Sequence, residues 1–96
     1  MPAYIIAEIQ ITDPAAYDKY RPLAAASVAR FGGRFIVRGC KVDLLEGEPQ
    51  PERIVVIEFP DPDTALRWYR SDEYQTALKI RQAASRGRVL LVEGAG

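Results

Sequence analysis

Apolar residues gather in short runs that are separated by amphipathic stretches. "YIIAEIQI" (4–11) and "RIVVIEF" (53–59) are rich in β-branched residues and predict strands, and "GRVLLVEG" (87–94) predicts the last strand. "RFIVRG" (34–39) and "CKVDLLEG" (40–47) together predict one long strand with a bulge at Gly39. "EGEPQPE", which is dense in turn formers, predicts a loop before the third strand.

Two Asp-Pro pairs predict helix starts. Asp13 and Asp61 can each accept hydrogen bonds from free backbone N–H groups, and the proline that follows each of them suits a first helical turn. Gly32-Gly33 predicts the end of the first helix. Ser71 predicts another N-cap, followed by a helix that carries four residues on one side: Tyr74, Ala77, Leu78 and Arg81.

The resulting order is strand–helix–strand followed by strand–helix–strand. Two right-handed βαβ units that share an antiparallel sheet form a ferredoxin-like α+β sandwich with βαββαβ order. No linker divides the 96 residues, so we expect one domain over residues 1–96.

Neither face of this sheet has a polar pattern. In the first strand, Ile5, Ala7 and Ile9 point to one side while Tyr4 and Ile6 point to the other. Strands that are apolar on both faces are buried on both faces. Because the helices of one subunit cover only one face, we expect a homodimer in which two sheets pair face to face as a dimeric α+β barrel.

Composition excludes several classes of function. The chain has 13 Lys plus Arg, 13 Asp plus Glu and no His, so net charge supports neither nucleic-acid nor membrane binding. The absence of histidine argues against His-ligated haem, the usual zinc sites and Ser–His triads, and we expect no cofactor and no metal. Flavin, which needs no histidine, is not excluded by this argument. Cys40 is the only cysteine and is interpreted as a small buried residue; it predicts a reducing, cytoplasmic location.

An ordered set of motifs carries a family resemblance. "DPAAYDKY", "GGRFIVRG", "LEG", "PERIVVIEFP" and "ALRWYRSDEYQ" follow one another, with Arg81 after them. From about Tyr4 to Gly94 the chain resembles domain-of-unknown-function family 1330, within the dimeric α+β barrel superfamily. The resemblance implies a barrel dimer with a pocket between the sheet and the helices of each subunit. Relatives in that superfamily include cofactor-free monooxygenases, isomerases and haem enzymes, so the fold alone does not decide the function.

Several polar and aromatic residues are candidates for the pocket. Glu58 ends an apolar strand, and Arg38 and Arg81 are its expected partners. In the functional interpretation, arginine orients a small anionic or phenolic ligand, aromatic rings stack on it, and a desolvated Glu58 moves a proton. Glu58 is thus the candidate catalytic residue, and the predicted substrate-binding residues are Arg38, Glu58, Trp68, Ser71, Tyr74 and Arg81.

Each candidate also has a structural interpretation. Glu58 and its arginine can form an ion pair that only ties a helix to the sheet. Trp68 at helical spacing is typical of a core residue, and Ser71 is mainly an N-cap. Three functions therefore remain open: a small-ligand protein that acts as a cofactor-independent enzyme, a non-catalytic ligand-binding or sensing module, and a structural dimerisation protein without a ligand.

Overall fold

A computed structural model describes residues 1–39 and 41–95. In this part of the chain it contains four strands and three helices in the order β1 (Ala3–Ile11), α1 (Pro14–Arg30), β2 (Arg34–Arg38), β3 (Arg53–Phe59), α2 (Pro62–Arg70), α3 (Asp72–Ala84) and β4 (Ser85–Glu93). Cys40, which the sequence predicts to be a small buried residue, lies outside the described residues. None of the described helices is long and apolar enough to cross a membrane.

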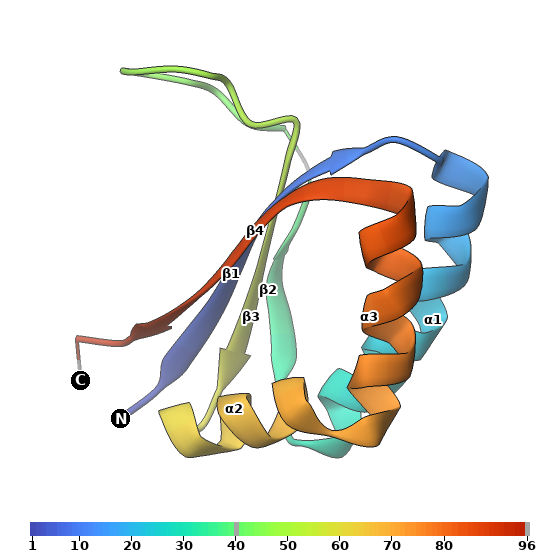
Figure 1. The fold of residues 1–96 in the computed structure, drawn as a ribbon. Coiled ribbons are helices and arrows are strands. Elements are labelled where there is room, and N and C mark those ends of the chain that lie inside the picture. The colour runs from blue at the N-terminus through green and yellow to red at the C-terminus, as the bar shows by residue number, and fades with distance from the viewer. Residues whose placement is uncertain (40, 96) are drawn as a thin grey trace.

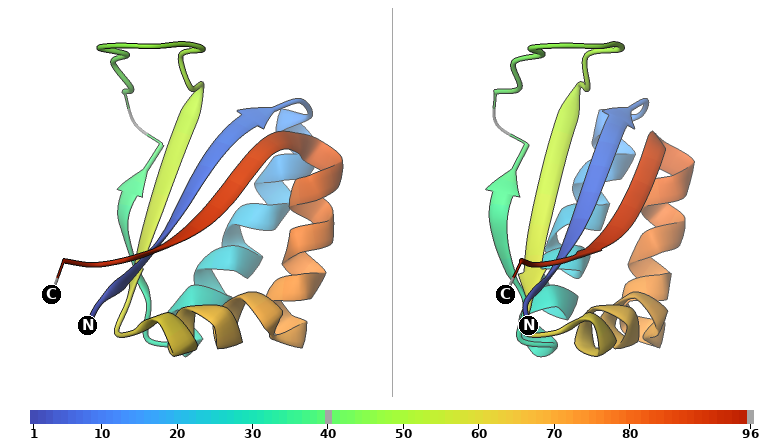
Figure 2. Two further views of the ribbon diagram at one scale, coloured as in Figure 1. Left: turned by 60° about the vertical axis from the view of Figure 1, so that its left-hand side comes forward. Right: turned by 90° about the vertical axis from the view of Figure 1, so that its left-hand side faces the viewer.

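The strands form one sheet in the order β2-β3-β1-β4, and all neighbours are antiparallel. Figure 2 shows the four strands side by side with the helices behind them. The two central strands belong to different halves of the chain, as the ferredoxin-like fold requires. The predicted α+β sandwich with βαββαβ order is therefore confirmed.

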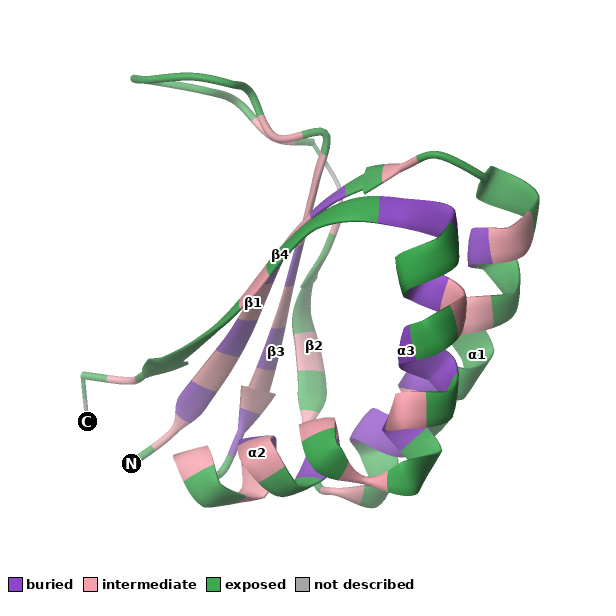
Figure 3. Cartoon of the chain, viewed as in Figure 1, coloured by how far each residue is buried: buried purple, intermediate pink, exposed green. Residues whose placement is uncertain are grey.

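Alternation along the two central strands separates a helix-covered face from an open face. In β1, alternate residues from Ala3 to Ile9 are buried, and in β3 Val55, Ile57 and Phe59 are buried. Because successive side chains of a strand point to opposite faces, these buried residues lie on the face that the helices cover, and the residues between them lie on the open face. Figure 3 shows the alternation of buried and less buried positions along β1 and β3. The chain therefore has a single-sided core.

The three predicted N-caps are present. The carboxylate of Asp13 accepts from the Ala16 N–H at 3.2 Å, and that of Asp61 accepts from the Thr64 N–H at 2.7 Å. The Asp61–Thr64 hydrogen bonds hold the pKa of the Asp61 carboxyl below its usual value. The Ser71 hydroxyl accepts from the N–H of Tyr74 at 3.2 Å, which starts α3 directly after α2.

Trp68 joins three helices to the sheet. Its indole Nε1 on α2 donates to the Ser27 hydroxyl on α1 at 3.0 Å. Its ring lies 4.0 Å from the Tyr74 ring on α3 and 5.2 Å from the Phe59 ring on β3, measured between centroids. Only 1% of Trp68 is exposed. The prediction that Trp68 is a core residue is thus confirmed, although its buried N–H also has a specific partner.

The prediction of one long strand over residues 34–47 is wrong. β2 ends at Arg38, and residues 41–45 belong to no strand. The irregularity in pairing lies between Phe35 and Val37, not at Gly39, which has a left-handed φ of 73°. The segment before β3 contains Pro49 and Pro51, which have no N–H to donate to a neighbouring strand. The sequence from 41 to 52 instead extends beyond the sheet as a loop (Figure 1).

Gly87 allows close approach of β4 to β1. It has a φ of 150°, and a Cβ atom built there would overlap the carbonyl oxygen of Glu8. We expect Gly87→Ala to lower the free energy of unfolding by about 3 kcal/mol, because overpacking against the backbone adds to backbone strain. Chemical denaturation measures this loss.

Gly32→Ala is the matched control, because Gly32 also has a positive φ, 74°, but has open space around it. It should cost about 1 kcal/mol, the strain alone. Equal losses in the two variants would show that the close contact between β4 and β1 contributes nothing.

Candidate functional site

A cavity of about 680 Å³ lies between the helix-covered face of the sheet and the helices. It exists because α1 packs mainly on α3 and not closely on the sheet (Figure 1). Side chains of the central strands form an apolar wall, which includes Ile5, Ala7, Ile9, Val55 and Ile57. Trp68 and Tyr74 also line the cavity, although both are almost fully buried. This volume and lining are typical of a site for a small organic molecule.

The charged side chains of the cavity are unbalanced. Four arginines line it, namely Arg21, Arg38, Arg53 and Arg81, whereas Asp18 is the single carboxylate among the described lining residues. Asp18 forms an ion pair with Arg21, with 3.1 Å between the carboxylate and Nε. Because arginine remains charged at neutral pH, the empty cavity carries an excess of positive charge.

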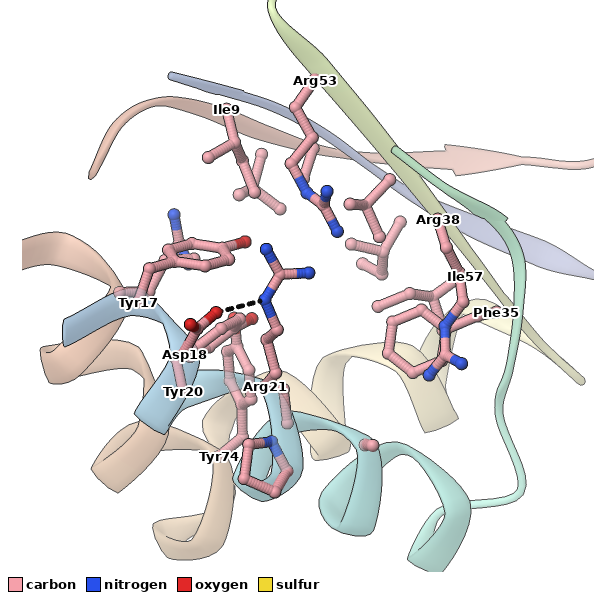
Figure 4. A pocket seen from close by; sticks show the side chains of 18 of the residues that line it. Ile9, Tyr17, Asp18, Tyr20, Arg21, Phe35, Arg38, Arg53, Ile57 and Tyr74 are labelled. Atoms are coloured by element: carbon pink, nitrogen blue, oxygen red, sulfur yellow. Dashed lines mark hydrogen bonds and ion pairs between the residues drawn. The ribbon is translucent and has the colours of Figure 1, made fainter. Parts of the chain in front are cut away.

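Arg53 reaches into the cavity from the start of β3. Its position alternates with Val55 and Ile57, so it lies on the helix-covered face (Figure 4). Gly39 makes room for it, because a Cβ atom at Gly39 would overlap the Arg53 guanidinium. The Nε atom of Arg53 is buried and has no hydrogen-bond partner within the described chain.

Arg81 is a buried cation on α3. It is 7% exposed, and no carboxylate in the described ranges forms an ion pair with it. Its Nε is also buried without a partner among the described residues. Burial by itself would lower the pKa of Arg81, but its coupling to the Tyr74, Tyr20 and Tyr69 hydroxyls raises the pKa overall. This buried guanidinium therefore adds an uncompensated positive charge to the wall of the cavity.

Three tyrosines add hydroxyl groups to the cavity. The Tyr20 and Tyr74 hydroxyl oxygens lie 2.9 Å apart and share a hydrogen bond. Burial, followed by the proximity of Tyr74, raises the pKa of Tyr20 far above its usual range. Burial also raises the pKa of Tyr17, although the guanidiniums of Arg53, Arg21 and Arg81 oppose this shift. The Tyr17 and Tyr20 hydroxyls are therefore protonated hydrogen-bond donors at neutral pH.

The structure brings four of the six predicted binding residues to the cavity: Arg38, Trp68, Tyr74 and Arg81. The Arg38 guanidinium lies over the Phe35 ring, 4.2 Å from its centroid. Ser71 is not among the lining residues; its hydroxyl caps α3 and donates to the Trp68 carbonyl. The N-cap interpretation of Ser71 is thus confirmed.

The expected pairing of Glu58 with Arg38 or Arg81 is wrong. Glu58 lies one residue beyond Ile57, so its side chain belongs to the opposite face of the sheet from the cavity. There its Oε1 accepts from Nε of Arg34, its cross-strand neighbour, at 2.7 Å. A second pair on the open face joins Glu8 to Arg88 at 3.1 Å. Each pair joins a central strand to an outer strand, β3 to β2 and β1 to β4, toward opposite edges of the sheet.

Sequence reasoning missed Arg21, Arg53, Tyr17 and Tyr20 as cavity residues. Arg53 could have been found, because it shares the period of two with Val55 and Ile57. Tyr17 and Tyr20 lie three residues apart in α1, but nothing in the sequence shows that α1 stands off the sheet. Within the described ranges, no group of three His, Cys, Asp or Glu side chains could hold a metal ion.

The family follows from the sequence match. A family model described as "Domain of unknown function (DUF1330)" matches residues 2–95. The chain belongs to the DUF1330 family. No curated protein matches the chain in sequence. The resemblance noted from the motifs is thereby confirmed.

Solved structures confirm the fold of this DUF1330 protein. A protein of unknown function from Rhodopseudomonas palustris has a TM-score of 0.81 at 20% identity, with 99% of this chain and 83% of that chain covered. SnoaB, a cofactor-independent oxygenase from Streptomyces nogalater, has a TM-score of 0.70 at 17% identity, with 99% and 94% covered. A dimeric protein of unknown function and ferredoxin-like fold from Bacteroides fragilis has a TM-score of 0.60 at 14% identity, with 97% and 95% covered.

Removing the Arg81 charge should leave the empty protein about as stable as before. If Arg81 neutralised a buried carboxylate, Arg81→Met would cost about 3–5 kcal/mol. Because it has no such partner in the described chain, we expect a change in the free energy of unfolding of less than about 1 kcal/mol, or a gain. Chemical denaturation without added ligand measures this change.

Ser27→Ala is the reference for a lost buried interaction. It leaves the Trp68 N–H unpaired and should cost about 1–3 kcal/mol in the same assay. A loss in Arg81→Met larger than that in Ser27→Ala would mean that the guanidinium is a structural tie.

Proposed function

We propose that this protein binds a small organic anion with an apolar body in the cavity of each subunit of a homodimer. The observation that carries the proposal is the excess of arginine over carboxylate in an otherwise apolar cavity. An uncompensated buried cation is costly, and an anionic ligand would relieve that cost. The apolar wall would hold the hydrophobic part of the same molecule.

The polar chemistry of the cavity favours an acceptor-rich ligand. Guanidinium groups only donate hydrogen bonds, and the tyrosine hydroxyls with raised pKa remain donors. Asp18, the one described carboxylate of the lining, already accepts from Arg21. Carboxylates match the donor fork of arginine in geometry and charge, so a carboxylic acid is the ligand class that fits best.

Binding receives more support than catalysis. Glu58, the residue expected to move a proton, lies on the far face of the sheet from the cavity. Asp18, the other carboxylate to consider, has a side chain that is 70% exposed and is paired with Arg21, so desolvation does not prepare it as a base. We therefore propose a site that binds or senses a ligand. Chemical turnover of the bound molecule is not part of this proposal.

The homodimer is proposed from the open face of the sheet. At its centre lie Tyr4, Ile6, Ile54 and Val56, and toward the edges Val37, Leu90 and Val92 remain more than one-third exposed. A continuous apolar face of this kind is typical of an interface. Pairing with a second copy would cover it, and the related Bacteroides fragilis structure is dimeric. The Glu58–Arg34 and Glu8–Arg88 pairs would then lie toward the rim.

Small carboxylates should stabilise the protein. In a thermal-shift screen of aromatic and aliphatic carboxylates at millimolar concentration, we expect at least one to raise the melting temperature by several degrees, because it binds only the native state. Arg53→Met should lose this response.

Arg34→Met is the matched control, because Arg34 has the same charge but lies on the open face, paired with Glu58. It should keep the response. Stabilisation of Arg53→Met to the same extent as the wild type would place the bound carboxylate outside the cavity.

The wild type should be a dimer at micromolar concentration. A covered sheet face would bury about 800 Å² per subunit, which is the size of a stable interface. Val56→Glu places a charge at the centre of the open face and should shift the mass measured by light scattering toward the monomer, 10.7 kDa.

Leu23→Glu is the control, because Leu23 is an exposed apolar residue on α1, away from the open face. It should remain dimeric. A wild type that is monomeric at these concentrations would rule out the face-to-face dimer.

A further inference from the structure

The donors of the cavity form two neighbouring groups, both of which include residues of α1. One group, the arginine group, consists of Arg21 from α1 and Arg53 from β3, with the Tyr17 hydroxyl beside them. In Figure 4 their side chains point toward one another across the cavity. The other group, the tyrosine pair, consists of Tyr20 and Tyr74 on the two packed helices, next to buried Arg81. The two groups differ in charge and in exposure.

The arginine group suits a fully charged oxygen pair. The Arg21 guanidinium carbon lies 5.1 Å from the centroid of the Tyr17 ring, and the Tyr17 hydroxyl is coupled to Arg53. Nε of Arg21 donates to the Asp18 carboxylate, so the two terminal nitrogens of Arg21 stay available to donate to a ligand. Two guanidiniums that face the same space repel each other until an anion lies between them. A carboxylate there could accept from both arginines and from the tyrosine.

The tyrosine pair suits a neutral oxygen. Arg81 can only donate, so beside the Tyr74 hydroxyl it favours the arrangement in which Tyr74 in turn donates to Tyr20. The Tyr20 O–H is then free to donate into the cavity that Tyr20 lines. Because burial keeps Tyr20 protonated, it offers a hydrogen bond without giving up its proton. Its matching partner is a carbonyl or hydroxyl oxygen of the ligand.

We propose that the ligand is an aromatic oxo- or hydroxy-carboxylic acid, with its carboxylate between Arg21 and Arg53 and its second oxygen on the Tyr20 hydroxyl. This inference rests on the proposed function and adds the second oxygen and its position. The apolar wall on the sheet side of the cavity, which includes Val55, Ile57 and Ile9, contacts the ring system. A cavity of about 680 Å³ accommodates one ring or two fused rings.

Isothermal titration with three probes tests the inference: 2-naphthoate, 6-hydroxy-2-naphthoate and 7-hydroxy-2-naphthoate. The wild type should bind one of the two hydroxylated acids about tenfold more tightly than 2-naphthoate, the gain from one buried hydrogen bond. Tyr20→Phe should abolish that preference and keep its affinity for 2-naphthoate within about twofold. Arg53→Met should weaken all three probes by at least about tenfold.

Tyr4→Phe is the control for the lost hydroxyl, because Tyr4 lies on the open face, and it should behave as the wild type. If the wild type binds 2-naphthoate and the hydroxylated acids equally, the proposed recognition of a second oxygen by Tyr20 is wrong, whereas the proposal of anion binding stands. A preference that survives in Tyr20→Phe also overturns the inference. If no probe binds and the carboxylates of the thermal-shift screen also fail, the proposed function itself is wrong.

Discussion

The hydrogen bond from the Trp68 indole to the Ser27 hydroxyl sets the spacing on which the rest of the structure depends. Ser27 also donates to the Ala24 carbonyl, so the acceptor is fixed within α1. Through Trp68, α1 is joined to α2, and the tilted contacts of its ring with those of Tyr74 and Phe59 continue the packing into α3 and β3. These large rings fill the space near one end of the layer between helices and sheet. Farther from these rings, α1 packs on α3, and the space between α1 and the sheet remains open as the cavity.

The period of two along β3 then sorts the charges. Arg53 lies on the face that lines the cavity, whereas Glu58, five residues later, lies on the other face and binds Arg34. The carboxylates of the strands thus lie outside the cavity, whereas arginines from four elements line it. This alternation accounts both for a cation-rich cavity and for an apolar open face whose ion pairs join the central strands to the outer strands.

The sequence predicts the fold well because its signals are local. The Asp-Pro pairs and Ser71 each act within a few residues, and each caps a helix where expected. The site is predicted only in part. Arg81 and Tyr74 follow from helical spacing, but the partner of Glu58 depends on strand register, which the sequence does not state. Likewise, Tyr17 and Tyr20 line a cavity only because α1 stands off the sheet, a result of tertiary packing around Trp68. The end of β2 also depends on tertiary pairing, because Arg38 is its last residue to pair with β3.

The central claim is that the cavity holds an anion by its arginines, and a crystal structure with 4-bromobenzoate tests it most directly. Anomalous scattering locates the bromine without assumptions about the ligand. The account predicts one bromine per subunit against the apolar wall of Val55 and Ile57, with the carboxylate within hydrogen-bond distance of Arg53. An empty cavity at saturating ligand, or bromine found only on the outer surface, would contradict it.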